Sequence, residues 1–212
     1  MKLYTFFRSS AAFRLRIALN YKGLAYEALP VSLPKNEHKL AGYLVLNPQG
    51  LVPALDDRGT VLVQSLAMME YLEETHPLPP LLPATAADRA YVRAVAQIIA
   101  CEIHPLNNLR TLRYIKQRFA LDEGGVNQWY RHWIAEGLGG LEAYVAGAKK
   151  SGKYCYRDQV TLADCCLVPQ VFNAQRYQCE LAPYPEVMRI FGECMKLDAF
   201  IAAQPSKQPD AS

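Results

Sequence analysis

The stretch FFRSSAAFRLRIAL, residues 6–19, joins a strand to a helix and decides the fold of the first part of the chain. Residues 2–6 alternate as a β-strand does, whereas residues 11–22 carry apolar side chains at helical spacing. Gly23 is the kind of residue that ends such a helix. A second strand is predicted over residues 26–31, so the chain opens with a β-α-β unit.

A hairpin and a helix are predicted next. Residues 53–64 contain two short apolar runs separated by Asp57, Arg58 and Gly59, which have the chemistry of a tight turn. Residues 65–75 then show helical periodicity. The order of elements is therefore β-α-β, a loop, and β-β-α.

After residue 84 the strand patterns nearly vanish, and a helix bundle is predicted instead. Pro105 interrupts the first helical pattern and Pro169 lies inside the third. The proline-rich stretch 76–83 is predicted to be a linker, and the polar tail, residues 204–212, is predicted to be frayed. The four helical patterns cover residues 87–119, 126–149, 161–177 and 185–197.

Together these patterns predict an α/β domain of thioredoxin-like order, residues 1–83, followed by an all-α domain, residues 84–212. A fold of this kind says little about function by itself.

The composition excludes several classes of function. The net charge is only +3 and the basic residues are scattered, which argues against a nucleic-acid partner. No apolar run reaches the roughly 18 residues of a membrane span, and the N-terminus lacks the apolar core of a signal peptide. A cytoplasmic protein without membrane attachment is expected.

The cysteine spacing shows no metal-like pattern and no CxxC pair, so we expect neither a metal site nor a dithiol reductase. Buried, reduced thiols are the simplest interpretation. The cysteines are Cys101, Cys155, Cys165, Cys166, Cys179 and Cys194.

Several motifs resemble those of the soluble glutathione transferases. LVPAL at 51–55 and VQS at 63–65 resemble their glutathione-binding frame, and TLAD at 161–164 resembles their N-capping box. SSAAFRLRIAL resembles the zeta-class signature, in which Ser-Ser-Cys precedes an aromatic residue and Arg-x-Arg-Ile-Ala-Leu. The resemblance covers essentially the whole chain. It implies the two-domain glutathione transferase fold, a homodimer, bound glutathione and the isomerisation of a maleyl keto acid.

The chain departs from this signature at Ala11, which replaces the cysteine, and at Phe13, which replaces a tryptophan. Ala11 rules out a protein thiol as the nucleophile at that position. A thiolate that adds to a maleyl double bond leaves a single bond that can rotate before the thiolate is expelled, so glutathione is expected to supply it. The maleylpyruvate-type relatives also lack the cysteine, which favours maleylpyruvate over maleylacetoacetate.

The residues at the helix start are the candidates for holding that thiolate. Ser9 is the first choice, with Arg8 adding positive charge and backbone N–H groups around Ser10 and Ala11 contributing. Alternatively, one of the two serines serves only as the helix N-cap. For Ser10 the sequence favours neither the capping role nor the catalytic role.

The resemblance also assigns residues to glutathione. Gln64 and Ser65, at a second helix start, would bind its γ-glutamyl end, and Val52 would pair with its cysteinyl amide beside a cis Pro53. By residue type alone, a histidine such as His38 would be a solvated loop residue. The complete glutathione set is His38, Gln49, Val52, Pro53, Gln64, Ser65, His104 and Asn108.

An anionic substrate requires cations. His104, Asn108 and Arg110 cluster around Pro105, and Arg176 lies near the end of a later helix, where relatives place an arginine against a carboxylate. The alternative for the cluster is an exposed, solvated face. Arg8, Arg110 and Arg176 are the predicted substrate-binding residues.

Three functions follow from these features. The leading one is a glutathione-dependent cis–trans isomerase of maleylacetoacetate or maleylpyruvate, serving the breakdown of an aromatic compound. The alternative is a general glutathione transferase that conjugates electrophiles. A non-catalytic binding module would predict a degraded glutathione frame, and here that frame is intact.

Overall fold

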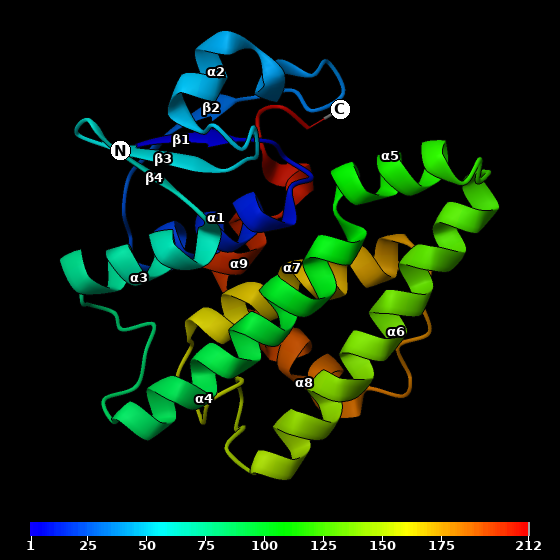
Figure 1. Cartoon of the computed structure of the whole chain (residues 1–212). Coiled ribbons are helices and arrows are strands. Elements are labelled where there is room, and N and C mark those ends of the chain that lie inside the picture. Colours follow the sequence, from blue (N-terminus) through cyan, green and yellow to red (C-terminus); the bar gives the residue numbers. More distant parts are fainter. Residues whose placement is uncertain (212) are drawn as a thin grey trace. The chain divides into compact units, whose positions relative to one another are not determined.

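Within residues 1–211, which the computed structural model describes, a four-stranded sheet forms the centre of the N-terminal region (Figure 1). Its strands lie in the order β2-β1-β3-β4, with β1 parallel to β2 and the other pairs antiparallel. Arg58 and Gly59 connect the last two strands with left-handed φ angles of 54° and 91°, as the predicted tight turn requires. The strands are β1 (Lys2–Thr5), β2 (Glu27–Pro30), β3 (Ala54–Asp57) and β4 (Thr60–Val63).

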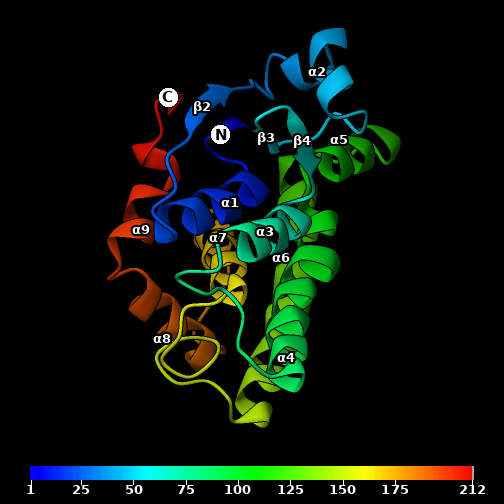
Figure 2. The same ribbon diagram turned by 90° about the vertical axis from the view of Figure 1, so that its left-hand side faces the viewer.

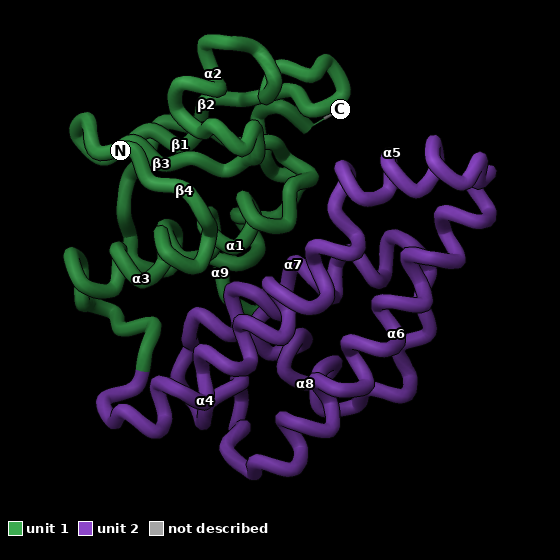
Figure 3. The backbone as a smooth tube through the Cα atoms, in the orientation of Figure 1, with its two compact units in different colours: residues 1–82, 195–212 green, residues 83–194 purple. Residues whose placement is uncertain are grey.

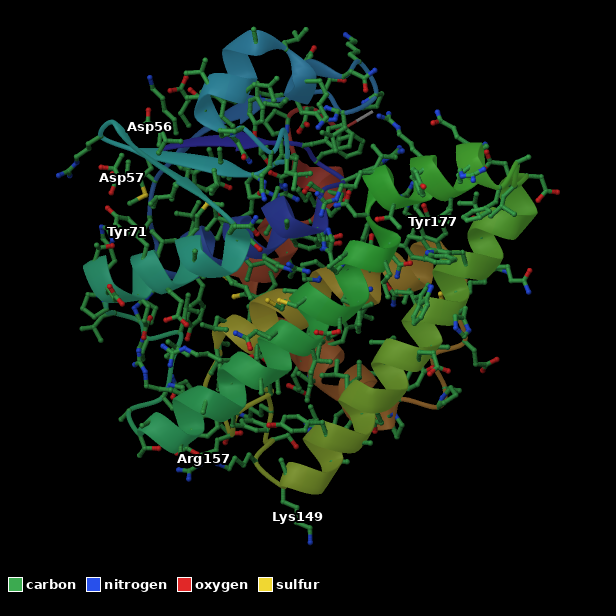
Figure 4. The ribbon with its side chains drawn as sticks, in the orientation of Figure 1. Asp56, Asp57, Tyr71, Lys149, Arg157 and Tyr177 are labelled. Atoms are coloured by element: carbon green, nitrogen blue, oxygen red, sulfur yellow. The ribbon has the colours of Figure 1, made fainter. Side chains whose placement is uncertain are left out.

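Helices cover both faces of this sheet. α1 (Ser10–Tyr21) and α3 (Ser65–Thr75) lie on one side, and α2 (Ala41–Leu46) lies on the other (Figures 1 and 2). Tyr71 of α3 donates a hydrogen bond to Asp57 at the end of β3, so α3 is tied to the hairpin (Figure 4). The predicted β-α-β and β-β-α order is confirmed.

The structure divides into two compact units (Figure 3). Unit 1 comprises Met1–Leu82 together with the chain from Met195 onward, and unit 2 comprises Pro83–Cys194. The sequence had placed everything after residue 84 in the helical domain. The C-terminal part belongs instead with the sheet, because its helix α9 (Asp198–Ala202) packs against α1.

Residues 204–211 of the polar tail are not frayed as predicted, and the remaining residue of that prediction, 212, lies outside the described residues. Arg16, whose side chain is fully buried, donates from Nε to the Ala203 carbonyl at 3.0 Å, and Asp210 accepts the Phe7 N–H at 2.9 Å. These contacts tie the tail to the start of the chain. Sequence patterns do not reveal such long-range partners, so a polar, proline-containing segment gives no sign of support.

A buried ion pair closes the C-terminal end of α1. The Lys22 ammonium lies 2.9 Å from a Glu73 carboxylate oxygen and also donates to the carbonyls of His76 and Pro79. Glu73 in turn accepts the backbone N–H groups of Leu81 and Leu82. Every charge in this cluster is met by hydrogen bonds, which is the condition for burying an ion pair. The predicted linker is therefore anchored to unit 1.

Unit 2 is helical, as predicted. α7 is buried throughout residues 162–171 and contacts α4 and α8, which explains the nearly continuous apolar sequence of that part. Thr161 and Asp164 form the predicted capping box at its start. The helices are α4 (Ala86–Gln97), α5 (Leu109–Arg118), α6 (Glu123–Ala148), α7 (Leu162–Arg176) and α8 (Pro185–Cys194).

The first helical pattern of unit 2 does not form one helix. After α4 the chain widens into a π-helical turn, Ile98–Ile103, and then tightens into a 3-10 turn, His104–Asn107, before α5 begins. Pro105 lacks an N–H group and cannot continue the helical ladder. A Cβ added at Gly137 of α6 would lie 2.6 Å from Cδ1 of Ile103, so the glycine allows this irregular turn to approach α6 closely.

The expectation that the cysteines are buried holds only in part. Cys155, Cys165, Cys166 and Cys194 are buried, whereas Cys179 is half-buried and Cys101 is exposed in the π-helical turn. The widened turn directs Cys101 outward, which helical periodicity does not anticipate. Among residues 1–211, no helix is both long and apolar enough to cross a membrane.

Candidate functional site

The start of α1 is shaped by Ser9. Its backbone is extended (φ −70°, ψ 117°), and its Oγ accepts the Ala12 N–H at 3.2 Å, so Ser9 is the N-cap of the helix. Ser10 is the first helical residue and its side chain is buried. The capping role that the sequence left open for Ser10 therefore falls to Ser9. A hydroxyl oxygen that accepts one bond retains its hydrogen for donation.

A tight turn precedes this helix. Ser9 donates its backbone N–H to the Phe6 carbonyl at 2.9 Å, which closes a turn over residues 6–9. Arg8 is exposed at the tip of the turn, with its guanidinium carbon 4.8 Å from the centre of the Phe7 ring. A positive side chain and the N-terminus of a helix thus occur at one place, which favours an anion.

The segment before β3 presents backbone groups in a fixed geometry. The Val52–Pro53 peptide bond is cis, as the resemblance implied, and both side chains are buried. The preceding carbonyl, that of Leu51, accepts hydrogen bonds of 2.7 Å from the Tyr43 hydroxyl and from the Asn47 side-chain amide. Tyr43 and Asn47 were not predicted as site residues, because their role depends on the irregular fold of residues 34–50.

The start of α3 is the second helix N-terminus of unit 1. Gln64, its N-cap residue, has a left-handed φ of 70°, which is unusual for a residue other than glycine. Its side-chain amide donates to Oε1 of Gln49 at 2.7 Å. Ser65 is buried and its Oγ accepts a hydrogen bond of 3.3 Å from the buried Arg14 guanidinium. Strained backbone is often retained where it serves a binding site.

The structure therefore brings together three of the predicted glutathione residues, since Gln49 is hydrogen-bonded to Gln64 and Ser65 follows Gln64 directly. Arg14 is an addition that the sequence reasoning missed. The sequence signal for Arg14 is its place as the first arginine of FRLRIAL, on a helix that is buried almost throughout. An arginine in such a position requires a polar partner inside the protein.

His38 is buried, with 6% of its surface exposed, and is not the solvated loop histidine that residue type alone suggested. It lies in a 3-10 turn, Glu37–Lys39, and its carbonyl would be 2.8 Å from a Cβ added at Gly50. Lys39 donates to the Gln49 carbonyl at 3.3 Å. The His38 turn therefore packs against the same loop that carries Gln49.

In unit 2, His104 and Asn108 are brought together. Nε2 of His104 lies 3.3 Å from the side-chain nitrogen of Asn108, whose Oδ1 accepts the Arg110 N–H at 3.1 Å and caps α5. Trp129 of α6 donates to the Leu106 carbonyl at 2.8 Å and holds this turn in place. The residues around Pro105 are thus organised by specific contacts, while the Arg110 side chain itself is exposed.

Arg176 is the last residue of α7 and is exposed. Its guanidinium carbon lies 5.2 Å from the centre of the Tyr177 ring, and Tyr177 (Figure 4) stacks on Tyr130 with centroids 3.6 Å apart. Burial raises the pKa of the Tyr130 hydroxyl, so Tyr130 carries no charge beneath the Tyr177 ring. Arg110 and Arg176 come from different helices, and each presents a charge to solvent.

The groups of unit 1 described above are suited to binding an anion or a thiolate. Unit 1 supplies the N-termini of α1 and α3, the Ser9 hydroxyl and the charge of Arg8. The buried Arg14 guanidinium supports the start of α3 through Ser65. Across residues 1–211, no three His, Cys, Asp or Glu side chains are grouped so that they could hold a metal ion.

Comparison with known proteins agrees with this geometry. Residues 1–74 match the model of the glutathione S-transferase N-terminal domain. The chain is 50% identical to maleylpyruvate isomerase from a Ralstonia species over 212 residues, covering 100% of both chains.

Two solved structures share the fold over their full length. The holo structure of maleylpyruvate isomerase, a bacterial glutathione S-transferase of the zeta class, has a TM-score of 0.98 at 50% identity and covers 100% of each chain. Maleylacetoacetate isomerase from Methylobacterium extorquens AM1, with bound malonate and glutathione, has a TM-score of 0.97 at 39% identity and the same coverage of 100%. This chain therefore belongs to the zeta class of the glutathione S-transferase family.

Proposed function

We propose that this chain is a glutathione-dependent cis–trans isomerase that converts a maleyl keto acid, maleylpyruvate or maleylacetoacetate, into its fumaryl isomer. The observation that carries the proposal is the start of α1, where a serine hydroxyl and helix N–H groups meet while position 11 is alanine. The 50% identity to the Ralstonia maleylpyruvate isomerase over the full length of both chains supports this proposal. The same identity, together with Ala11, favours maleylpyruvate as the substrate.

The residues of unit 1 suit the binding of glutathione. When bound, its thiolate supplies the nucleophile whose reversible addition lets the substrate double bond rotate. The backbone of Val52, beside the cis proline, is suited to pair with the cysteinyl amide. Gln64 and Ser65 are suited to the γ-glutamyl carboxylate, and His38 and Gln49 to the glycyl end.

The main task of Ser9 is to keep the bound thiol deprotonated. A free thiol with a pKa near 8.5 is only about 3% thiolate at pH 7. Lowering that pKa by about two units requires about 2.7 kcal/mol of differential stabilisation. A donated O–H bond, the N-terminus of α1 and the nearby Arg8 charge together reach that order of magnitude. The Ala12 N–H uses only a lone pair of the Ser9 oxygen, so the hydroxyl hydrogen remains for donation to the thiolate.

The arginines suit the acidic substrate. Arg8, Arg110 and Arg176 are all exposed and therefore able to meet a carboxylate from solvent. The family resemblance of the sequence also assigns His104 and Asn108 to glutathione. The malonate and glutathione bound together in the Methylobacterium relative represent these two classes of ligand, a dicarboxylate and the thiol tripeptide.

The proposal extends to the setting of the reaction. We place the enzyme in the cytoplasm, as a homodimer, in the breakdown of an aromatic compound. The family resemblance of the sequence supports the dimer and the pathway, and reduced cysteines support the compartment.

The decisive experiment measures isomerisation of maleylpyruvate and maleylacetoacetate side by side, with and without glutathione, and conjugation of a chloronitrobenzene in parallel. We expect rapid, glutathione-dependent isomerisation, faster with maleylpyruvate. Conjugation without isomerisation would instead identify a general glutathione transferase. Failure to bind glutathione at all would contradict both functions.

A further inference from the structure

The turn that presents Ser9 is held from outside by two charged side chains. Three backbone groups in its first half, the Phe6 carbonyl and both polar groups of Phe7, are bonded to Arg16 or Asp210. Neither residue belongs to the glutathione frame described above. Both lie in unit 1, one on α1 and the other in the C-terminal tail.

Arg16 forms the inner half of this clamp. Its Nη2 donates to the Phe7 carbonyl at 3.0 Å, and its Nη1 lies 3.5 Å from the Phe6 carbonyl and 3.2 Å from the Thr5 hydroxyl. Burial lowers the pKa of the guanidinium to about 10, while the nearby Tyr26 and Asp210 side chains act in the opposite direction. The guanidinium therefore remains charged at neutral pH.

Asp210 forms the outer half. One of its carboxylate oxygens accepts the Phe7 N–H at 2.9 Å, across 203 positions of sequence. The tail that carries it is fixed by Arg16 itself, through the Ala203 carbonyl, and by the Gln208 side chain, which donates to the carbonyls of Ala202 and Gln204. Arg16 thus holds the turn directly and the segment leading to Asp210 indirectly.

The consequence reaches Ser9 through the Phe6 carbonyl. That carbonyl accepts the Ser9 N–H that closes the turn. Phe7 and Arg8 are the only residues between the clamped carbonyl and Ser9, so a shift at Phe7 moves both the Ser9 hydroxyl and the Arg8 side chain. Displacements of about 1 Å at a reacting group can change rates by about a hundredfold.

We propose that Arg16 and Asp210 are positioning residues for the thiolate site, and that the C-terminal tail is a working part of that site. This inference rests on the proposed glutathione-dependent function. It predicts that the tail acts on chemistry through Ser9 and does more than add stability to unit 1.

The test replaces Asp210 with alanine in the full-length protein. We expect the thiol pKa of bound glutathione to rise and kcat to fall about tenfold. The pKa is measured from the absorbance of the thiolate. The double variant Ser9→Ala with Asp210→Ala should lose no more than Ser9→Ala alone, because residues that act through one group are not additive.

Asp198→Ala is the matched control, because it removes an exposed carboxylate from the same C-terminal segment. Its thiol pKa and kcat should equal those of the wild type. Asp210→Asn keeps an acceptor oxygen but loses the charge facing Arg16, so it should raise the thiol pKa by a smaller amount. It also serves if the alanine variant does not fold.

Two results would overturn the inference while leaving the proposed function intact. One is a wild-type thiol pKa and kcat in folded Asp210 variants, even with a lowered melting temperature. The other is a full additional loss when Asp210→Ala is combined with Ser9→Ala. A wild-type protein that neither binds glutathione nor isomerises would instead remove the proposed function itself.

Discussion

The Ser9 side chain illustrates how one hydroxyl serves both helix and chemistry. Its oxygen caps α1 by accepting the Ala12 N–H, and its hydrogen remains available to a thiolate. The sequence posed capping and catalysis as alternatives for the serine pair. The structure makes them compatible for Ser9, because the two roles use opposite ends of the same O–H bond.

Replacing Ser9 with alanine should raise the thiol pKa of bound glutathione and lower turnover by roughly tenfold to a thousandfold, as for loss of one donor to a developing charge. The measurement is a spectroscopic titration of the bound thiol together with steady-state kinetics.

Ser9→Gly separates the two roles, since glycine preserves most of the capping preference but has no hydroxyl. Both variants should raise the thiol pKa, whereas the alanine variant should lose more stability. Exposed Thr60 of β4 provides a control position for replacing a hydroxyl side chain by alanine. An unchanged thiol pKa in Ser9→Ala would move the role to Ser10 or to the helix backbone.

The arginines should be sensitive to replacement by lysine. If Arg176 and Arg110 bind a carboxylate through the planar guanidinium, the lysine variants should be nearly as impaired as the alanine variants. One charge-assisted hydrogen bond is worth about 1.5–3 kcal/mol, so kcat/KM for the keto acid should fall roughly 10- to 150-fold. Glutathione affinity should change less for Arg176 than for Arg110, which lies beside His104 and Asn108.

Activity toward a neutral chloronitrobenzene, measured on the same preparations, should be spared. Arg118→Lys, at the exposed end of α5, is the control. Equal losses on charged and neutral substrates would place these arginines on glutathione or in the fold.

Among the elements, those with local start and stop signals were predicted well. The helix over residues 65–75 has the same bounds in the structure, and the hairpin turn lies at Arg58 and Gly59. The short helix α2 was missed, because six residues cannot show helical periodicity and its support comes from Tyr43 bonded to the Leu51 carbonyl. Local patterns reveal elements that stabilise themselves, and they miss those held by distant partners.

The irregular turn between α4 and α5 yields a prediction about Gly137. An alanine there would place its Cβ 2.6 Å from Cδ1 of Ile103, which directly precedes His104. We expect destabilisation of about 1–3 kcal/mol from overpacking. The displaced turn should also raise the KM for glutathione or substrate.

Gly140→Ala is the matched control on the same helix, because nothing lies within 4 Å of its added Cβ. It should gain up to about 1 kcal/mol from helix propensity. Thermal unfolding and kinetics of both variants test the point. A Gly137→Ala protein with wild-type kinetics would show that the turn is structural only.

For the whole molecule, the prediction concerns the requirement for the thiol of glutathione. With alanine at position 11, the chain has no cysteine of its own at the start of α1. Protein stripped of glutathione should therefore isomerise no faster than the uncatalysed reaction, and added glutathione should restore the rate. Comparable activity without glutathione would rule out the mechanism, and a thiol-free analogue of the tripeptide should inhibit by competition.

At the same scale, the sequence indicated two regions with different patterns and a linker between them, and the structure bears out the change from α/β to all-α character. The sequence pattern does not show that the chain from Met195 onward returns to unit 1. That return depends on Arg16 and Asn20, which bond to the carbonyls of Ala203 and Ala199. Backbone carbonyls carry no sequence signature, so no motif could announce the pairing.

The contact between Phe7 and Asp210 also bears on the order in which the protein can be built. It joins groups 203 positions apart, so it cannot form before residue 210 has been synthesised. A nascent fragment ending at residue 82 would contain the whole sheet but would lack the Ala203 carbonyl that meets the buried Arg16 guanidinium. Only a chain synthesised through residue 210 would complete the turn at Ser9, so that catalytic competence would follow the folding of the sheet.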